Sequence, residues 1–168
     1  SMLEEERYIA NLTSSILGGS STSRLFERIR EEEGLAYSIF SYENFLRSTG
    51  TLGICAGISP QVFKRTMQLI TEEIRKFREE PVPEQELNTN REQIKGGMLM
   101  GLESTSARMS RMAKSMMTFD RVVPIEEVIA NVDAVTCDEV NNYARKTYQP
   151  ETMALAVLGP KGDYSMEG

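Results

Sequence analysis

Two strand-like runs followed by a long amphipathic helix constrain the fold of this chain most. Residues 35–45 and 51–58 read as strands, and the second run alternates apolar residues with small ones along its length. Polar and glycine residues separate the two runs, which predicts an antiparallel hairpin. From residue 60 onward, apolar side chains recur at steps of four and three, the spacing of one helix face. That helical stripe consists of Phe63, Met67, Ile70, Ile74 and Phe77.

The remaining periodic segments predict further helices and one more strand. Two amphipathic helices precede the hairpin, with Gly34 placed to end the second. Thr136 and Glu139 have the spacing of a capping box, which predicts a helix start there. Expected helices cover 3–17, 20–33, 60–77, 83–102, 104–119, 124–135 and 136–148, and a last strand covers 152–158. We therefore expect one domain, 1–168, of α+β class, with helices packed on one face of a mainly antiparallel sheet.

Composition excludes several kinds of site. The chain of 168 residues contains no histidine, so Ser-His-Asp and Cys-His nucleophilic sites and His-ligated zinc are excluded within it. Its two cysteines, Cys55 and Cys137, are far apart and lack CxxC spacing. We expect both to be buried thiols, and we expect no metal site on this chain.

Charge and hydropathy limit the partners and the location. The net charge of −6 argues against nucleic-acid binding, which needs clustered Lys and Arg. Without an apolar run long enough to cross a membrane, and with an acidic rather than signal-like start, a cytoplasmic protein is expected. Ser1 ahead of Met2 is typical of a cloning scar.

Two local patterns allow both a structural and a functional interpretation. Met109, Met112 and Met116 share one helix face, and we interpret them as core residues rather than as a binding surface. The acidic run 31–33 at a helix end is expected to be a solvated face. Its alternative role is to attract basic segments of a substrate.

The candidate functional residues lie between the first helix and the hairpin. Gly18 and Gly19 precede a helix, as in loops that cradle anions, although a simple helix stop explains them as well. Arg30 near a helix end and Tyr37 early in a strand flank the corner residue Gly34, so both can face one cleft. Arginine and tyrosine supply hydrogen-bond donors suited to a peptide carbonyl. From spacing alone, an exposed arginine and a half-buried tyrosine without a shared function are the favoured interpretation.

Residues 16–38, ILGGSSTSRLFERIREEEGLAYS, resemble the C-terminal half of the M16 zinc metallopeptidases, the insulinase, pitrilysin and mitochondrial processing peptidase family. The likeness continues through Glu72-Glu73, residues 103–105 and 133–136, and the closing LAVLGP over 155–160. The resemblance implies a LuxS/M16-type fold in which two α+β halves enclose a chamber. Zinc would be bound by an H-x-x-E-H motif in the other half, a motif absent from this chain.

By this resemblance, Arg30 and Tyr37 are the catalytic and substrate-binding residues that this half contributes. Arg30 would hold the peptide, and Tyr37 would hydrogen-bond the carbonyl oxygen under attack. Gly18 and Gly19 match the glycine stretch that lies near the substrate. The chain alone is expected to be inactive and to need an N-terminal zinc-bearing half or a catalytic partner subunit.

Two departures from the family pattern carry expectations of their own. Relatives begin with strand sequence ahead of the first helix, so we expect the sheet to lack one or more N-terminal strands and to have an exposed edge. Such an edge can pair with a second copy of the chain. Glu31–Glu33 stand where relatives often carry basic residues, so a relative's substrate preference does not transfer. The alternative function is a non-catalytic M16-like subunit that binds peptides or supports a catalytic partner.

Overall fold

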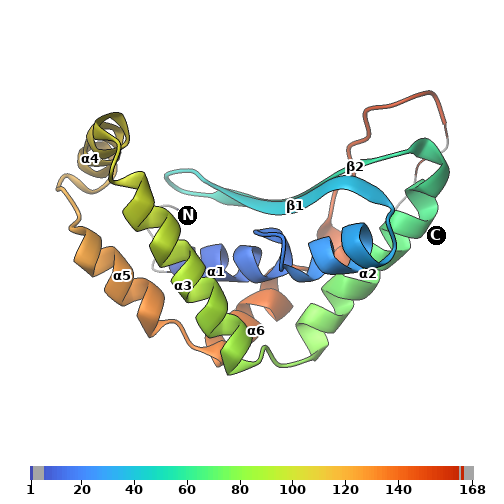
Figure 1. Cartoon of the computed structure of the whole chain (residues 1–168), viewed down its shortest axis with the longest axis horizontal. Helices are drawn as coiled ribbons and strands as arrows, with labels where there is room; N and C mark the ends of the chain where they lie inside the picture. The colour runs from blue at the N-terminus through green and yellow to red at the C-terminus, as the bar shows by residue number, and fades with distance from the viewer. Residues whose placement is uncertain (2–5, 163, 165–168) are drawn as a thin grey trace.

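A computed structural model describes residues 1, 6–162 and 164 of the chain. The hairpin β1 (Ala36–Phe45) and β2 (Gly50–Ile58) lies above helix α1 (Glu6–Gly18), as seen in Figure 1. The other elements are η1 (Phe26–Glu32), η2 (Pro60–Val62), α2 (Phe63–Glu79), α3 (Glu84–Gly101), α4 (Thr105–Phe119), α5 (Ile125–Ala134), α6 (Cys137–Thr147) and η3 (Pro150–Thr152). None of the helices in the described part of the chain is long and apolar enough to cross a membrane.

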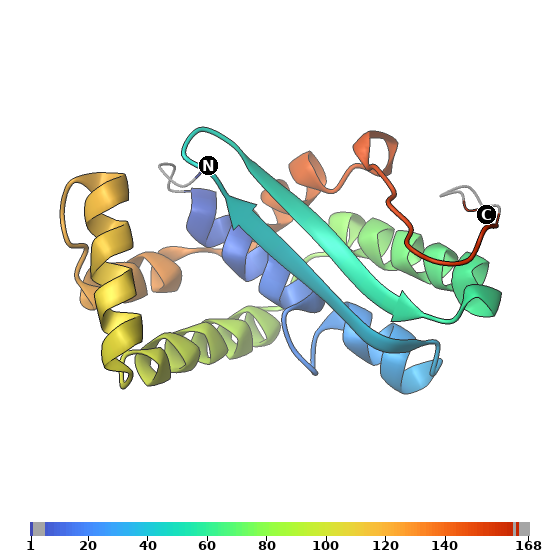
Figure 2. The ribbon, with the colours of Figure 1, turned by 90° about the horizontal axis from the view of Figure 1, so that it is seen from above.

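The predicted hairpin is confirmed. Strands β1 and β2 pair antiparallel, with Phe40 opposite Cys55 and Tyr42 opposite Gly53, and a β-bulge interrupts the register between Ala36 and Ser38. Figure 2 shows the strands running obliquely over α1, so one face of the hairpin is covered by helices and the other is open. The α+β arrangement of helices on one face of an antiparallel sheet is therefore as expected.

The core forms where α1, α2, α6 and the start of α3 meet beneath the hairpin. The α2 stripe points into it as predicted, with Ile74 and Phe77 almost completely buried and Met67 partly buried. Leu12, Ile16 and Leu17 of α1 are fully buried in the same cluster. The apolar periodicity of these helices is thus satisfied by mutual burial, which supplies most of the stability of short helices.

Helix termini follow their local sequence. Thr136 accepts a hydrogen bond from the Glu139 backbone N–H, and the Glu139 carboxylate accepts one from the Thr136 backbone N–H, so the predicted capping box is present. Gly34 has a φ of +64°, the left-handed conformation that glycine adopts without a steric penalty. The chain therefore turns sharply at Gly34 between η1 and β1.

Several expectations about secondary structure or burial are wrong. Residues 152–158 form no strand: after η3 they pair with neither β1 nor β2, and Leu158 is fully exposed. Met109, Met112 and Met116 are exposed rather than core residues, because α4 makes no extensive contact with another element of the described chain. Cys55 is also exposed, because its side chain lies on the open face of the hairpin.

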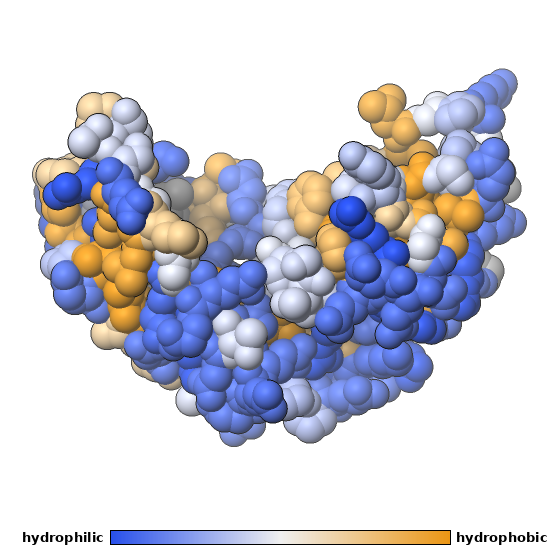
Figure 3. Space-filling view, in the orientation of Figure 1, coloured by the Kyte–Doolittle hydropathy of each residue, from blue (hydrophilic) through white to orange (hydrophobic). Residues whose placement is uncertain are grey.

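The methionines lie on an arm built from the end of α3, α4 and α5. Figure 1 shows this arm rising at one side of the molecule, with α2 at the opposite side and the hairpin between them. Apolar side chains gather on the surface of the arm in Figure 3. Apolar periodicity correctly predicted a helix here, but it did not predict which face other elements would cover.

Candidate functional site

Arg30 is positioned by a π-helical segment. Helix η1 was expected to be an ordinary helix, but Phe26–Glu32 has the wider turn of a π-helix. Such segments are rare and occur frequently at functional sites. Leu25 and Ile29 are fully buried and anchor the segment in the core, while Arg30 on the next position is exposed.

Two aromatic rings hold the Arg30 side chain. Its guanidinium carbon lies 4.8 Å from the centre of the Phe26 ring and 6.0 Å from the centre of the Tyr37 ring. Both separations are within the range of cation–π attraction. Arg30 and Tyr37 therefore come together as the sequence predicted, and Phe26, which is partly buried, packs beside Arg30.

Tyr37 projects from the start of β1 into solvent. The side chain is 87% exposed, which corrects the alternative of a half-buried tyrosine. Among the described residues, none hydrogen-bonds to its hydroxyl. The hydroxyl is consequently available to donate to an incoming group beside the Arg30 guanidinium.

The paired glycines line a hollow together with Arg30. This hollow, about 240 Å³ in volume, is called the arginine hollow below. Its lining comprises Gly18, Gly19, Ser20, Phe26, Arg30, Ser38, Ile39 and Phe40. Three of the four residues singled out from the sequence, Gly18, Gly19 and Arg30, thus share one concave surface, and Tyr37 precedes another lining residue, Ser38.

The two positions require glycine because there is no room for a side chain, and not because of an unusual backbone angle. A Cβ atom on Gly18 would collide with the backbone nitrogen of Ser41 in β1, and one on Gly19 would lie 2.6 Å from the Ser15 Cα. Neither glycine has a positive φ. Gly18 also ends α1, so the helix-stop interpretation and the lining of a hollow both apply.

The acidic run beside Arg30 is largely paired within the chain. Glu32 accepts a hydrogen bond from Arg28 at 2.6 Å, and Glu33 accepts one from Arg65 at 2.9 Å. Glu31 remains exposed, 4.0 Å from the Arg30 Nε atom. The interpretation as a solvated face fits these contacts better than an anionic surface reserved for a substrate.

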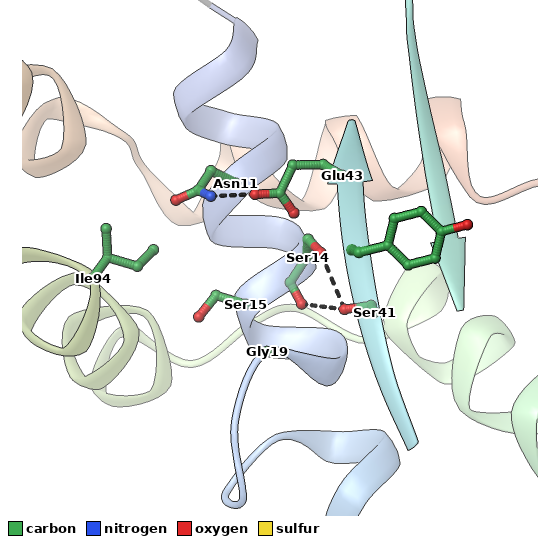
Figure 4. Close-up of a pocket in the computed structure, with 8 residues that line it drawn as sticks. Asn11, Ser14, Ser15, Gly19, Ser41, Glu43 and Ile94 are labelled. Carbon is green, nitrogen blue, oxygen red and sulfur yellow. Dashed lines mark hydrogen bonds between the residues drawn. The ribbon is translucent and has the colours of Figure 1, made fainter. Parts of the chain in front are cut away.

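Sequence patterns did not reveal a second hollow that adjoins the first. It has a volume of about 330 Å³, lies between α1, β1 and α3, and shares Gly19 with the arginine hollow. Its lining comprises Asn11, Ser14, Ser15, Gly19, Ser41, Tyr42, Glu43 and Ile94, and it is called the glutamate hollow below. Figure 4 shows how three separate elements contribute to it. No spacing within one element could have indicated it.

Metal binding does not fit the residues that the structure describes. Histidine is absent, and no group of three His, Cys, Asp or Glu side chains in the described ranges is arranged to hold a metal ion. Polar chemistry in the site comes instead from the Arg30 guanidinium, the Tyr37 hydroxyl and backbone groups near the glycines. These are donor groups suited to oxygen atoms of a peptide.

Comparison with known proteins identifies the family. The model of the peptidase M16 inactive domain matches residues 2–94, more than half of the chain. The chain belongs to the peptidase M16 inactive-domain family. The resemblance that the sequence segment 16–38 indicated is thereby confirmed.

Curated relatives agree with this assignment. The chain is 33% identical over 159 residues to YmxG of Bacillus subtilis, an uncharacterized zinc protease, covering 95% of this chain and 39% of that protein. With SCO5738 of Streptomyces coelicolor, also an uncharacterized zinc protease, it is 31% identical, covering 95% and 35%. The chain thus spans less than two fifths of the length of these curated relatives.

The fold itself recurs in solved structures. A protease from Helicobacter pylori matches with a TM-score of 0.78 at 16% identity, covering 89% of this chain and 36% of that one. The peptidase M16 inactive domain from Pseudomonas fluorescens matches with a TM-score of 0.73 at 18% identity, covering 86% and 34%. At these identities the likeness concerns the fold.

Proposed function

We propose that this chain is the peptide-binding half of a zinc-dependent endopeptidase of the M16 family. The observation that carries the proposal is the Arg30 guanidinium, which lies near the Phe26 and Tyr37 rings and lines a hollow together with Gly18 and Gly19. The match to uncharacterized zinc proteases supports the reaction class. The zinc ion would be bound by another half or subunit, because this chain has no histidine and its described residues form no group that fits the ion.

Arg30 would bind and orient the peptide. A guanidinium presents several donors in a fixed plane and can hydrogen-bond two oxygen atoms at once. The contacts with the Phe26 and Tyr37 rings restrict the orientations of that plane, so less side-chain freedom is lost when a peptide binds. Because Arg30 projects from η1 next to the arginine hollow, the bound segment would lie along the start of β1.

Tyr37 would stabilise the reacting carbonyl. When water attacks a peptide carbonyl, negative charge develops on the carbonyl oxygen, and a positioned hydroxyl donor is worth more in that state than in the ground state. The positive charge of the neighbouring Arg30 favours the same oxygen. Both groups would act on a peptide presented by the zinc-bearing half, so the isolated chain would bind peptides without hydrolysing them.

The experiment is peptide hydrolysis by the complete protein carrying Tyr37→Phe, Arg30→Ala or Arg30→Lys. Removal of one oxyanion donor lowers kcat by about 100- to 1000-fold, so Y37F is expected to lower kcat by about that factor. R30A is expected to raise KM as well, and R30K to restore only part of the loss, because an ammonium lacks the planar fork.

Tyr143→Phe on α6 is the matched control, because it removes a tyrosine hydroxyl that lines neither hollow. Wild-type turnover by both Y37F and R30A would refute the proposal. Absence of hydrolysis by the unmodified complete protein, with retained peptide binding, would instead favour the alternative of a non-catalytic peptide-binding subunit.

A further inference from the structure

The glutamate hollow has a polar lining for which the proposed roles of Arg30 and Tyr37 give no use. Asn11 and Ser15 reach it from α1, Glu43 from β1 and Ile94 from α3 (Figure 4). Asn11, Ser15 and Glu43 are each partly exposed, so a ligand can reach their polar atoms. The kind of ligand that the hollow can bind depends on which lining groups still have a hydrogen to donate and which present only acceptors.

Ser14 and Ser41 form the floor of the hollow, and neither has a hydroxyl hydrogen left to donate to a ligand. Ser41 Oγ donates to the backbone oxygen of Ser14 at 2.6 Å, which cannot be reversed because a carbonyl only accepts. The contact of 3.1 Å between the two hydroxyl oxygens must then use the Ser14 hydrogen, with Ser41 Oγ as the acceptor. Both serines are buried, and this closed pair forms a fixed base between α1 and β1.

The accessible groups likewise present acceptors. Ser15 Oγ donates its hydrogen to Asn90 Oδ1 at 2.7 Å, which leaves oxygen lone pairs toward the hollow. Asn11 Nδ2 donates to Glu43 Oε1, which leaves the Asn11 carbonyl oxygen and Glu43 Oε2 without a donor among the described residues. No Lys or Arg of the described chain forms an ion pair with Glu43.

A hollow with one carboxylate, several oxygen acceptors and no paired cation suits a donor-rich cationic group. A guanidinium or ammonium carries only donors, so it satisfies such a lining without leaving a polar atom unpaired. Ile94 supplies an apolar wall for the methylene groups of a long basic side chain. An anion would meet the Glu43 carboxylate, and the one hydrogen of the Asn11 amide that Glu43 does not use is the side-chain donor that Asn11 still offers.

We propose that the glutamate hollow binds an arginine or lysine side chain of a peptide, with Glu43 as its counter-ion. The peptide part of this inference rests on the proposed function. Both hollows border β1 and share Gly19, one along residues 38–40 and the other along 41–43. Because an extended chain rises about 3.3 Å per residue, the basic side chain would lie about three residues from the peptide group held at Arg30.

The test is binding of Nα-acetyl-arginine methylamide to this chain, followed by NMR of the backbone amides. The citrulline analogue, of nearly the same shape without the charge, is the matched probe. Binding of the arginine probe should shift the amides of Asn11, Ser15 and Glu43. Glu43→Gln retains an acceptor for Asn11 and should lower the affinity for the arginine probe about tenfold or more. Glu72→Gln on α2 removes the same charge outside both hollows and should leave binding unchanged.

The outcomes separate this inference from the proposed function. Equal binding of the arginine and citrulline probes, no binding of either, or equal affinity of E43Q and the unmodified chain would each overturn the cation site. None of these results depends on hydrolysis, which R30A and Y37F test in the complete protein. If those two variants hydrolyse peptides normally while the arginine probe still requires Glu43, the proposed function fails and the cation site stands.

Discussion

The guanidinium carbon of Arg30 lies 6.0 Å from the centre of the Tyr37 ring, although a turn through Gly34 separates the two residues in the chain. The arginine comes from a π-helical segment and the tyrosine from the first strand, so the corner between them sets their separation. Phe26 contacts the same guanidinium at 4.8 Å. Arg30 is thereby oriented by contacts within this chain.

Phe26 is expected to act as a positioning residue. Phe26→Leu removes a cation–π contact that contributes about 0.5–1 kcal/mol at an exposed site, so kcat/KM of the complete protein should fall about two- to fivefold. Phe26→Tyr keeps a ring and should restore activity. Phe45→Leu, which changes a phenylalanine outside both hollows, serves as the control. Equal losses in F26L and F45L would contradict the assignment.

Glycine-to-alanine substitutions should have opposite effects at two positions. Gly18→Ala introduces a Cβ against the Ser41 backbone nitrogen and is expected to lower the free energy of unfolding by about 1–3 kcal/mol. Gly96 lies inside α3 with nothing within 4 Å of an added Cβ, so Gly96→Ala should raise that free energy by about 0.5–1 kcal/mol. Urea unfolding of both variants measures the difference, and a change of the same sign in both would refute the packing argument.

The two cysteines should differ in reactivity. Burial raises the pKa of the Cys137 thiol to about 11, and its hydrogen bond to the Glu84 carboxylate adds to the shift. Little Cys137 thiolate therefore exists at pH 8, whereas Cys55 is exposed on the hairpin. Iodoacetamide at pH 8 should modify Cys55 first, as mass spectrometry of the peptides would show. Glu84→Gln should increase the rate at Cys137, and faster alkylation of Cys137 in the unmodified chain would contradict this order.

The methionine face of α4 should contribute little to stability. Met109 and Met116 are 66% and 46% exposed, so replacing each with glutamine is expected to change the free energy of unfolding by less than about 0.5 kcal/mol. Leu87 of α3 is fully buried, and Leu87→Ala should cost about 2–5 kcal/mol. Denaturant titrations of the three variants test the contrast. A loss for M109Q or M116Q close to that of L87A would place the methionines in the core after all.

Predictions made from neighbouring residues were the most accurate. Each depends on residues that are close together in the sequence. They are the α2 stripe, the capping box of Thr136 and Glu139, and the turn at Gly34. The pairing of Arg30 with Tyr37 was predicted because only a short corner separates them. Predictions that required knowledge of a packing partner failed, as for Cys55, Met112 and the segment 152–158.

Periodicity and motif spacing are local properties of the chain, so the hairpin, the helices around it and the family could be predicted from the residues alone. Tertiary structure alone decided which apolar faces are covered, since a helix face is buried only where another element lies against it. It also decided the glutamate hollow, whose acceptors come from α1, β1 and α3. Asn11 and Glu43 are 32 positions apart, and only the packing of β1 on α1 makes them hydrogen-bonding neighbours.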